Sequence, residues 1–199
     1  MIKKIYIFVL LTSALLFSCN QQNNEQVQIE RNIVSVGNEK VKLQTTMGDI
    51  IIQMNGDAAP LTVKNFLDYV ESGFYDGVIF HRVIPGFMIQ GGGLTEDMQD
   101  KKANDPVKNE FKISNTRGTI AMAKLGGDPD SATCQFFINV ADNSSNLDNQ
   151  NGGFTVFAKV VDGMDVVDEI AQVKTTYRNR MQDVPAEPVI IESAKIINE

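Results

Sequence analysis

The chain has 199 residues, a length that suits one domain with short extensions. With 43% hydrophobic and 22% charged residues, it has the composition of a globular protein and not of a disordered chain. Its net charge of −7 argues against a nucleic-acid partner, because proteins that bind nucleic acid carry a basic face. One histidine and two cysteines, Cys19 and Cys134, are too few for a multi-histidine zinc site or an iron–sulfur cluster, so we expect no metal centre.

The first 18 residues have the layout of a secretion signal. Lys3 and Lys4 precede residues 5–17, of which eleven are apolar, and this run is too short to span a bilayer. Ser18 then stands directly before Cys19. A small residue before a cysteine at this place resembles a bacterial lipoprotein signal, which implies an exported protein anchored to a membrane through lipidated Cys19. A plain signal peptide with an incidental cysteine is the alternative.

A polar stretch separates this signal from the rest of the chain. Seven of the nine residues 20–28 are Asn or Gln, and such a composition offers little apolar surface to bury. We therefore predict a flexible tether over residues 19–39 and a folded domain over residues 40–199.

The domain begins with a predicted hairpin and a helix. Residues 40–46 and 49–54 are rich in Val, Ile and Thr and flank a turn, which is typical of paired strands. Residues 59–72 have Pro60 in the first turn and Gly73 just past the end, as helices commonly do. Apolar residues recur there at helical spacing, at Val63, Phe66, Leu67 and Val70.

Six further strands and a second helix follow. The strands are predicted at residues 78–84, 87–90, 119–123, 134–140, 154–161 and 189–197, and the helix at residues 164–173. Three glycines, residues 91–93, are expected to end the fourth strand, and residues 142–153 are expected to form a long polar loop. About eight short strands and two helices predict a mainly β fold, a closed barrel or a sandwich. The phosphate-binding motifs GxxxxGK[ST] and GxGxxG are absent from the sequence, so we expect no nucleotide site.

Thirteen consecutive residues, 80–92, read Phe-His-Arg-Val-Ile-Pro-Gly-Phe-Met-Ile-Gln-Gly-Gly and resemble the signature segment of the cyclophilins, the peptidyl-prolyl isomerase family. Shorter matches lie at residues 63–66, 118–123, 135–138 and 156–160, so the resemblance extends from about residue 40 to residue 197. It implies a closed eight-stranded antiparallel barrel capped by two α-helices, with a peptide groove on its outer face. It also implies a monomer that acts on X-Pro bonds of polypeptide clients without a cofactor.

Arg82 and Gln90 are the candidate catalytic residues. Amide resonance gives the prolyl bond a barrier of about 18–20 kcal/mol, and a fixed cation with hydrogen-bond donors would stabilise the twisted bond. The guanidinium of Arg82 offers five donors in a rigid fork, and the resemblance places Gln90 in polar contact with it. The alternative is that Arg82 forms a surface salt bridge. His81 is expected to be structural, because this chemistry needs no proton transfer.

The resemblance also implies a set of substrate-binding residues. Ala123 and Lys124 would line the groove, Gln135 would make polar contacts around Arg82, and Phe154 would lie at the rim. The proline pocket itself would be formed by Phe87, Met88, Phe137 and Leu147. The alternative is that the apolar members of this set are ordinary core residues.

Two positions depart from the family pattern. Asn146 stands where the family often has Trp, and Phe154 stands where it often has His, so we expect weak binding of the cyclic peptide cyclosporin. The function favoured by the sequence is a lipid-anchored peptidyl-prolyl cis–trans isomerase that assists the folding of exported proteins. A proline-peptide-binding chaperone module with little isomerase activity and an inert structural lipoprotein are the alternatives.

Overall fold

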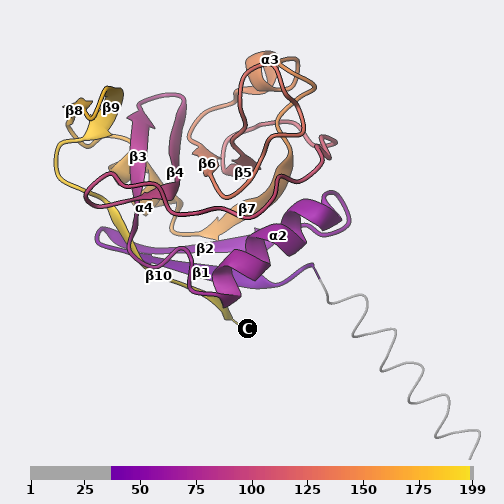
Figure 1. Cartoon of the computed structure of the whole chain (residues 1–199), viewed down its shortest axis with the longest axis horizontal. Coiled ribbons are helices and arrows are strands. Elements are labelled where there is room, and N and C mark those ends of the chain that lie inside the picture. Colours follow the sequence, from indigo (N-terminus) through magenta and orange to yellow (C-terminus); the bar gives the residue numbers. More distant parts are fainter. Residues whose placement is uncertain (1–36, 198–199) are drawn as a thin grey trace, which may run out of the picture. The chain divides into compact units, whose positions relative to one another are not determined.

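The computed structural model describes residues 37–197, so the predictions on the signal, on Cys19 and on most of the tether lie outside the described residues. Eight strands close a barrel in the order β1-β10-β3-β4-β6-β5-β7-β2, and every neighbouring pair is antiparallel (Figure 1). These strands are β1 (Lys40–Thr45), β2 (Gly48–Met54), β3 (Val78–Ile84), β4 (Met88–Thr95), β5 (Thr119–Met122), β6 (Phe136–Asn139), β7 (Val156–Asp162) and β10 (Ile190–Ile197). The predicted mainly β barrel is confirmed.

Three helices accompany the strands in the described part of the chain: α2 (Pro60–Glu71), α3 (Ser144–Leu147) and α4 (Met164–Ile170). Helix α2 packs against β10 and β7, and α4 packs against β2. Both helices contribute buried apolar side chains to the main core. Within that core, Phe66 of α2 lies 5.0 Å from Tyr75 and 5.0 Å from Phe157, measured between ring centroids. The observed bounds of α2 confirm the predicted helix at residues 59–72 within one residue at each end.

The barrel wall has apolar side chains on both of its faces beside the candidate site. On β6, Phe136 and Ile138 belong to the core inside the barrel, whereas Phe137 belongs to a separate apolar cluster. On β4, Ile89 and Met88 are divided in the same way. This is the alternation expected of a strand, whose successive side chains point to opposite faces. The second cluster therefore lies on the outer face of the barrel.

A second hairpin, β8 (Thr175–Arg178) and β9 (Met181–Pro185), lies outside the barrel and has no counterpart in the sequence predictions. Its turn residues Asn179 and Arg180 have φ values of 49° and 65°, which match the right-handed twist of a two-residue hairpin. Strand β9 packs against β3, and Val184 is buried there with other apolar side chains.

Strand β4 continues through the three glycines to Thr95, so the prediction that they end it is wrong. The glycines are needed because neighbouring groups come close to the strand. A Cβ at Gly91 would lie 2.8 Å from the carbonyl oxygen of Ile79, and one at Gly93 would lie 2.7 Å from Cγ of Gln135. Two smaller differences concern helices. The long polar loop contains α3, and α4 ends at Ile170 instead of residue 173.

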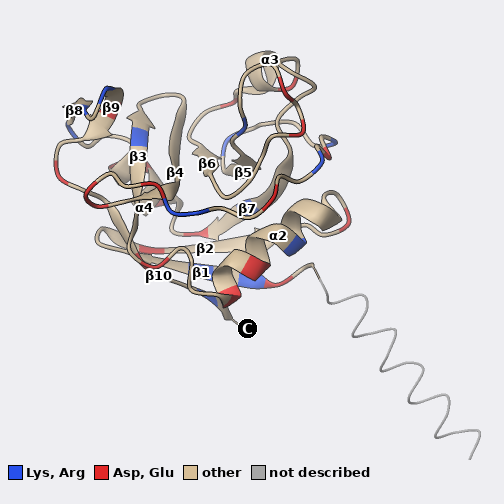
Figure 2. Ribbon diagram, viewed as in Figure 1, with Lys and Arg blue, Asp and Glu red and all other residues tan. Residues whose placement is uncertain are grey.

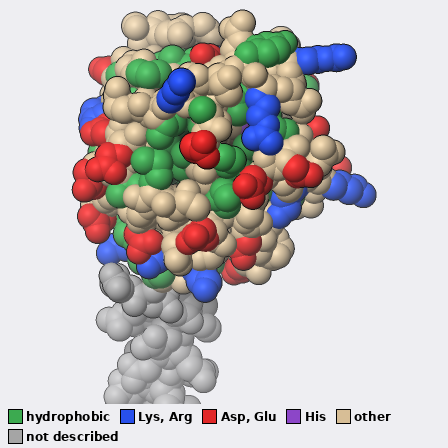
Figure 3. Space-filling view, turned by 90° about the vertical axis from the view of Figure 1, so that its left-hand side faces the viewer, with side chains coloured by type: hydrophobic (Ala, Val, Ile, Leu, Met, Phe, Trp, Pro, Cys, Tyr) green, Lys and Arg blue, Asp and Glu red, His purple; other side chains and the backbone are tan. Residues whose placement is uncertain are grey.

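Charged residues are unevenly distributed over the barrel. Strands β5 and β6 carry none, whereas β3 carries Arg82 on the same wall (Figure 2). On the face drawn in Figure 3, acidic, basic and hydrophobic side chains are interspersed. Within residues 37–197, no helix has the length and apolar character needed to cross a bilayer.

Candidate active site

One row of residues crosses the outer face of the barrel. Arg82 on β3 pairs with Gln90 on β4, Gln90 pairs with Phe137 on β6, and Phe137 pairs with Ala121 on β5. Residues that are directly opposite each other on paired strands point to the same face. The strand register therefore places a guanidinium, an amide and an aromatic ring side by side.

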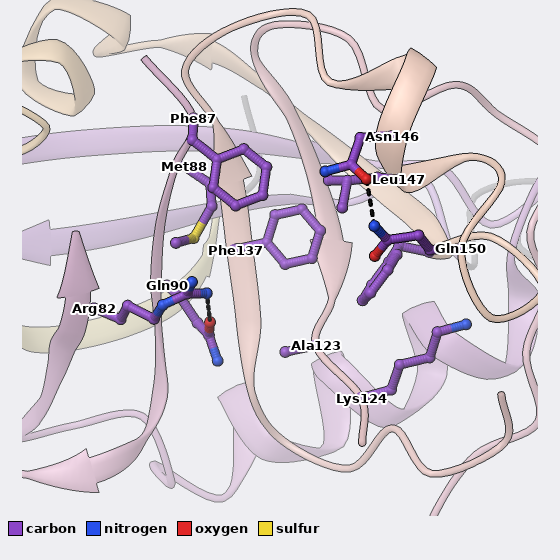
Figure 4. Close-up of a pocket in the computed structure, with 11 residues that line it drawn as sticks. Arg82, Phe87, Met88, Gln90, Ala123, Lys124, Phe137, Asn146, Leu147 and Gln150 are labelled. Carbon is purple, nitrogen blue, oxygen red and sulfur yellow. Dashed lines mark hydrogen bonds between the residues drawn. The ribbon is translucent and has the colours of Figure 1, made fainter. Parts of the chain in front are cut away.

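An open cavity of about 300 Å³ lies over this row. Its apolar side belongs to the outer cluster, in which Met88, Phe137 and Leu147 are at least 95% buried. Figure 4 shows Arg82 and Lys124 on opposite sides of the cavity with Phe137 between them. The cavity is lined by Arg82, Phe87, Met88, Gln90, Ala123, Lys124, Phe137, Asn146, Leu147, Gln150 and Phe154.

The polar side of the cavity is a short chain of hydrogen bonds. Nη1 of Arg82 donates to Oε1 of Gln90 over 3.4 Å, and Nε2 of Gln90 donates to Oε1 of Gln135 over 3.0 Å. Gln135 packs directly on Gly93, where a Cβ would displace it. Within residues 37–197, no carboxylate forms a salt bridge with Arg82, which counts against the alternative of a surface salt-bridge arginine. Most of its N–H donors are thus left for a ligand.

A buried chain of asparagines joins the two sides of the cavity. Nδ2 of Asn143 donates to the carbonyl oxygen of Phe87 over 2.8 Å and to Oδ1 of Asn139 over 2.7 Å. Nδ2 of Asn139 donates to Oδ1 of Asn115 over 3.3 Å, and Nδ2 of Asn115 reaches the carbonyl oxygen of Phe154 over 3.1 Å. Since buried amides are costly to leave unpaired, this chain holds the backbone on both sides of the cavity at a set separation.

The structure brings nine of the ten predicted catalytic and binding residues to one cavity, and the tenth, Gln135, accepts a hydrogen bond from Gln90. Sequence reasoning did not find Gln150, which lines the cavity and donates to Oδ1 of Asn146 (Figure 4). It also did not find the buried asparagine chain. The sequence gives no signal for this chain, because it depends on contacts between distant segments, such as Asn139 with Asn115 and Asn143 with the carbonyl oxygen of Phe87.

His81 is 1% exposed on β3 and does not line the cavity. Burial, together with the nearby positive charge of Arg82, lowers the pKa of His81 to about 4. Its Nδ1 atom has no hydrogen-bond partner among the described residues. The imidazole is therefore neutral at neutral pH and lies outside the space where a substrate would bind.

Comparison with known proteins identifies the family. The family described as cyclophilin type peptidyl-prolyl cis-trans isomerase/CLD matches residues 40–196. Peptidyl-prolyl cis-trans isomerase A of Dickeya dadantii is 54% identical over 163 residues, which cover 80% of this chain and 85% of that protein. Peptidyl-prolyl cis-trans isomerase B of Escherichia coli is 54% identical over 162 residues, covering 78% of this chain and 98% of that protein.

Solved structures agree with this result. A crystal structure of a cyclophilin type peptidyl-prolyl cis-trans isomerase of Cryptosporidium parvum, in the presence of the dipeptide Ala-Pro, matches with a TM-score of 0.68 at 25% identity. The match covers 81% of this chain and 100% of that one. The chain belongs to the cyclophilin-type peptidyl-prolyl cis–trans isomerases.

The low pKa of His81 predicts an acid-sensitive fold. Because the folded-state pKa of about 4 lies below the ordinary value of 6.5, the unfolded chain binds this proton first as the pH falls. The contribution of His81 to stability is therefore complete above pH 6.5 and is lost towards pH 4, by about 3 kcal/mol. Urea unfolding at several pH values should show that His81→Gln loses less free energy of unfolding between pH 6.5 and pH 4 than the unaltered protein does. Equal losses in the variant and the unaltered protein would contradict the low pKa assigned to His81.

Proposed function

We propose that the cavity catalyses cis–trans isomerisation of X-Pro peptide bonds through the fixed charge of Arg82. The observation that carries this proposal is a guanidinium without a salt bridge in the described chain, placed at the edge of an outward-facing cavity with an apolar wall. Membership of the isomerase family supports the reaction, and the geometry supports the assignment of roles to residues.

The two sides of the cavity suit the two parts of the substrate. The proline ring would lie on Phe137, Met88 and Leu147, where its apolar atoms leave water. The imide bond would then face Arg82. As the bond twists, resonance is lost and the nitrogen becomes pyramidal and basic, so it can accept a hydrogen bond that the planar amide cannot. Stabilisation that exists only in the twisted state lowers the barrier, by a factor of ten for each ~1.4 kcal/mol.

Gln90 and Gln135 would keep Arg82 in place. The Oε1 atom of Gln90 accepts from the guanidinium, and Gln135 in turn accepts from the amide of Gln90. A preorganised donor needs no reorientation when the bond twists, which is the advantage of a protein site over water. No step in this mechanism forms a covalent intermediate or moves a proton.

A chaperone module that binds proline peptides but isomerises them slowly is the second candidate. It would need the apolar cavity and would make no use of a preorganised guanidinium. The hydrogen-bond chain behind Arg82 therefore favours the enzyme.

We also propose an exported, membrane-anchored location, for which the support is sequence alone. The charged start, the short apolar run and the Ser18-Cys19 pair form a lipoprotein-type signal. Two or more acyl chains on Cys19 would give stable anchoring. Removal of residues 1–18, with Lys3 and Lys4, would leave the protein more acidic than −7, so attraction to anionic lipid would not contribute. The clients would then be exported proteins with slow X-Pro bonds.

Loss of the guanidinium should remove most of the activity and leave the fold intact. Arg82→Ala should lower kcat/KM for an Ala-Pro peptide by about 100-fold, the size expected for a lost transition-state donor. Arg82→Lys should lose nearly as much, because lysine keeps the charge but not the planar fork. Arg178→Lys, on the exposed hairpin strand β8, is the matched control. Near-full turnover by Arg82→Lys would contradict the role assigned to the fork.

Cyclosporin should bind weakly, because Asn146 and Phe154 supply neither the indole nor the imidazole that the family often has at these positions. Asn146→Trp combined with Phe154→His should tighten binding by about tenfold, since a tryptophan adds both apolar area and an N–H donor. Calorimetric titration measures this, with Tyr177→Trp on the exposed hairpin as a control for an added tryptophan. Tight binding by the unaltered protein would show that this part of the rim was assigned wrongly.

Membrane attachment should depend on Cys19. Cys19→Ser should release the isomerase from the membrane fraction or leave the unprocessed precursor, with the activity of the domain unchanged. Mass spectrometry of the native protein should find an acylated cysteine at the N-terminus. A soluble protein that starts, unmodified, downstream of this residue would support plain secretion instead.

A further inference from the structure

The backbone before Phe154 has an unusual conformation. Asn151, Gly152 and Gly153 have φ values of 50°, 78° and 75°, so three successive residues lie in the left-handed region. Gly153 also lies against the ring of Phe111, with which a Cβ at this position would clash. Glycine adopts such φ values without strain and asparagine tolerates them better than most residues, so contacts from neighbouring segments fix where this stretch lies. We call residues 151–154 the rim segment.

Lys124 makes several of the contacts that fix the rim segment. Its Nζ donates to the carbonyl oxygens of Asn151 over 2.7 Å and of Gly153 over 2.6 Å. The same ammonium lies 4.9 Å from the ring centroid of Phe154, a cation–π distance. Nδ2 of Asn151 returns a hydrogen bond to the carbonyl oxygen of Leu125 over 3.1 Å. The segment that follows β5 and the rim segment are thus joined by three hydrogen bonds.

Asn109 holds the rim segment from another side. Its Nδ2 donates to the carbonyl oxygens of Gly152 over 2.8 Å and of Gly153 over 3.2 Å. Together with Lys124, it satisfies all three successive carbonyls of the left-handed stretch. The carbonyl dipoles converge on the ammonium, so the charge of Lys124 contributes as well as its donors.

Phe154, the last residue of the rim segment, forms part of the cavity wall. The ring of Phe154 meets the ring of Phe137 edge-on, with centroids 5.7 Å apart and planes at 72°. Phe137 forms the apolar surface beside Arg82, and both phenylalanines line the cavity. A shift of the rim segment therefore alters the space available to a proline ring and leaves Arg82, on β3, in place.

We propose that Lys124 is a positioning residue, whose ammonium fixes the rim segment and thereby sets the width of the proline cavity. This role differs from a direct contact with the substrate, because two of its three donors are already used on the rim segment. The inference rests on the proposed function for its effect on the substrate, and on the hydrogen bonds alone for its effect on the rim. Partial burial lowers the pKa of Lys124, in keeping with an ammonium drawn out of solvent.

The test compares Lys124→Met, which keeps the length of the side chain, with Lys124→Arg, which keeps the charge and the donors. For an X-Pro peptide, Lys124→Met should raise KM by about tenfold, the order of a lost charged hydrogen bond, with kcat within about twofold. Lys124→Arg should recover most of this loss. Lys112→Met, an exposed lysine before β5, is the matched control and should change neither constant.

A second measurement does not depend on activity. The amides of Gly153 and Phe154 donate to the carbonyl oxygens of Gln150 over 2.8 Å and of Leu147 over 3.2 Å. In Lys124→Met, hydrogen exchange at these two amides should speed up by about tenfold, while amides of β6 should be unaffected. Unchanged exchange would overturn the proposal even if the unaltered protein proved inactive. Faster exchange without a change in KM, or a fall in kcat alone, would overturn the link to substrate binding.

Discussion

The site depends on the register of three strands. The pairing of β3, β4 and β6 aligns Arg82, Gln90 and Phe137 in one row on the outside of the barrel. A shift of one residue in any of these strands would turn a member of the row into the core, because side chains alternate between the two faces. A buried core beneath the row makes such a shift expensive, since Phe136 and Ile89 are both fully buried inside. The closed barrel thus holds the guanidinium of Arg82 in the fixed position that the proposed mechanism requires.

Hydrogen bonds outside the barrel core fix the side chains and loops around the cavity. Gly93 of β4 leaves room for Gln135 to pack on the strand, where it accepts a hydrogen bond from Gln90. On the other side of the cavity, the rim is tied by Lys124 and by the asparagine chain that reaches Asn115. Gln135, Lys124 and Asn115 lie in segments between strands. The strands fix the position of Arg82, and the loops joined by these hydrogen bonds set the shape of the cavity around it.

Local signals predicted much of the fold. Helix α2 was predicted within a residue at each end, because Pro60 and Gly73 mark its limits, and β3 was predicted in full. The hairpin β8–β9 was missed, since its turn uses Asn179 and Arg180 in the left-handed conformation and not the Asn-Gly pair that usually marks it. Strand β4 was cut short because three glycines suggest a loop when the groups that pack on them are unknown.

The candidate site was predictable chiefly through the resemblance of residues 80–92 to the cyclophilins. Spacing alone could pair Met88 with Gln90 on one face, but it could not bring either of them near Leu147. Lys124 reaches Asn151 across 27 positions, and the asparagine chain joins Asn139 to Asn115 across 24. Such contacts follow from the closure of the barrel, which no local pattern in the chain contains.

The central claim is that a fixed charge, without proton transfer, lowers the barrier of the X-Pro bond. The most direct test is the pH dependence of kcat/KM for an Ala-Pro peptide, measured on the purified protein between pH 6 and pH 8. An arginine stays protonated over this range and His81 stays neutral, so the account predicts a measurable rate that changes by less than about twofold. A bell-shaped profile, or a step near the ordinary histidine pKa, would contradict it.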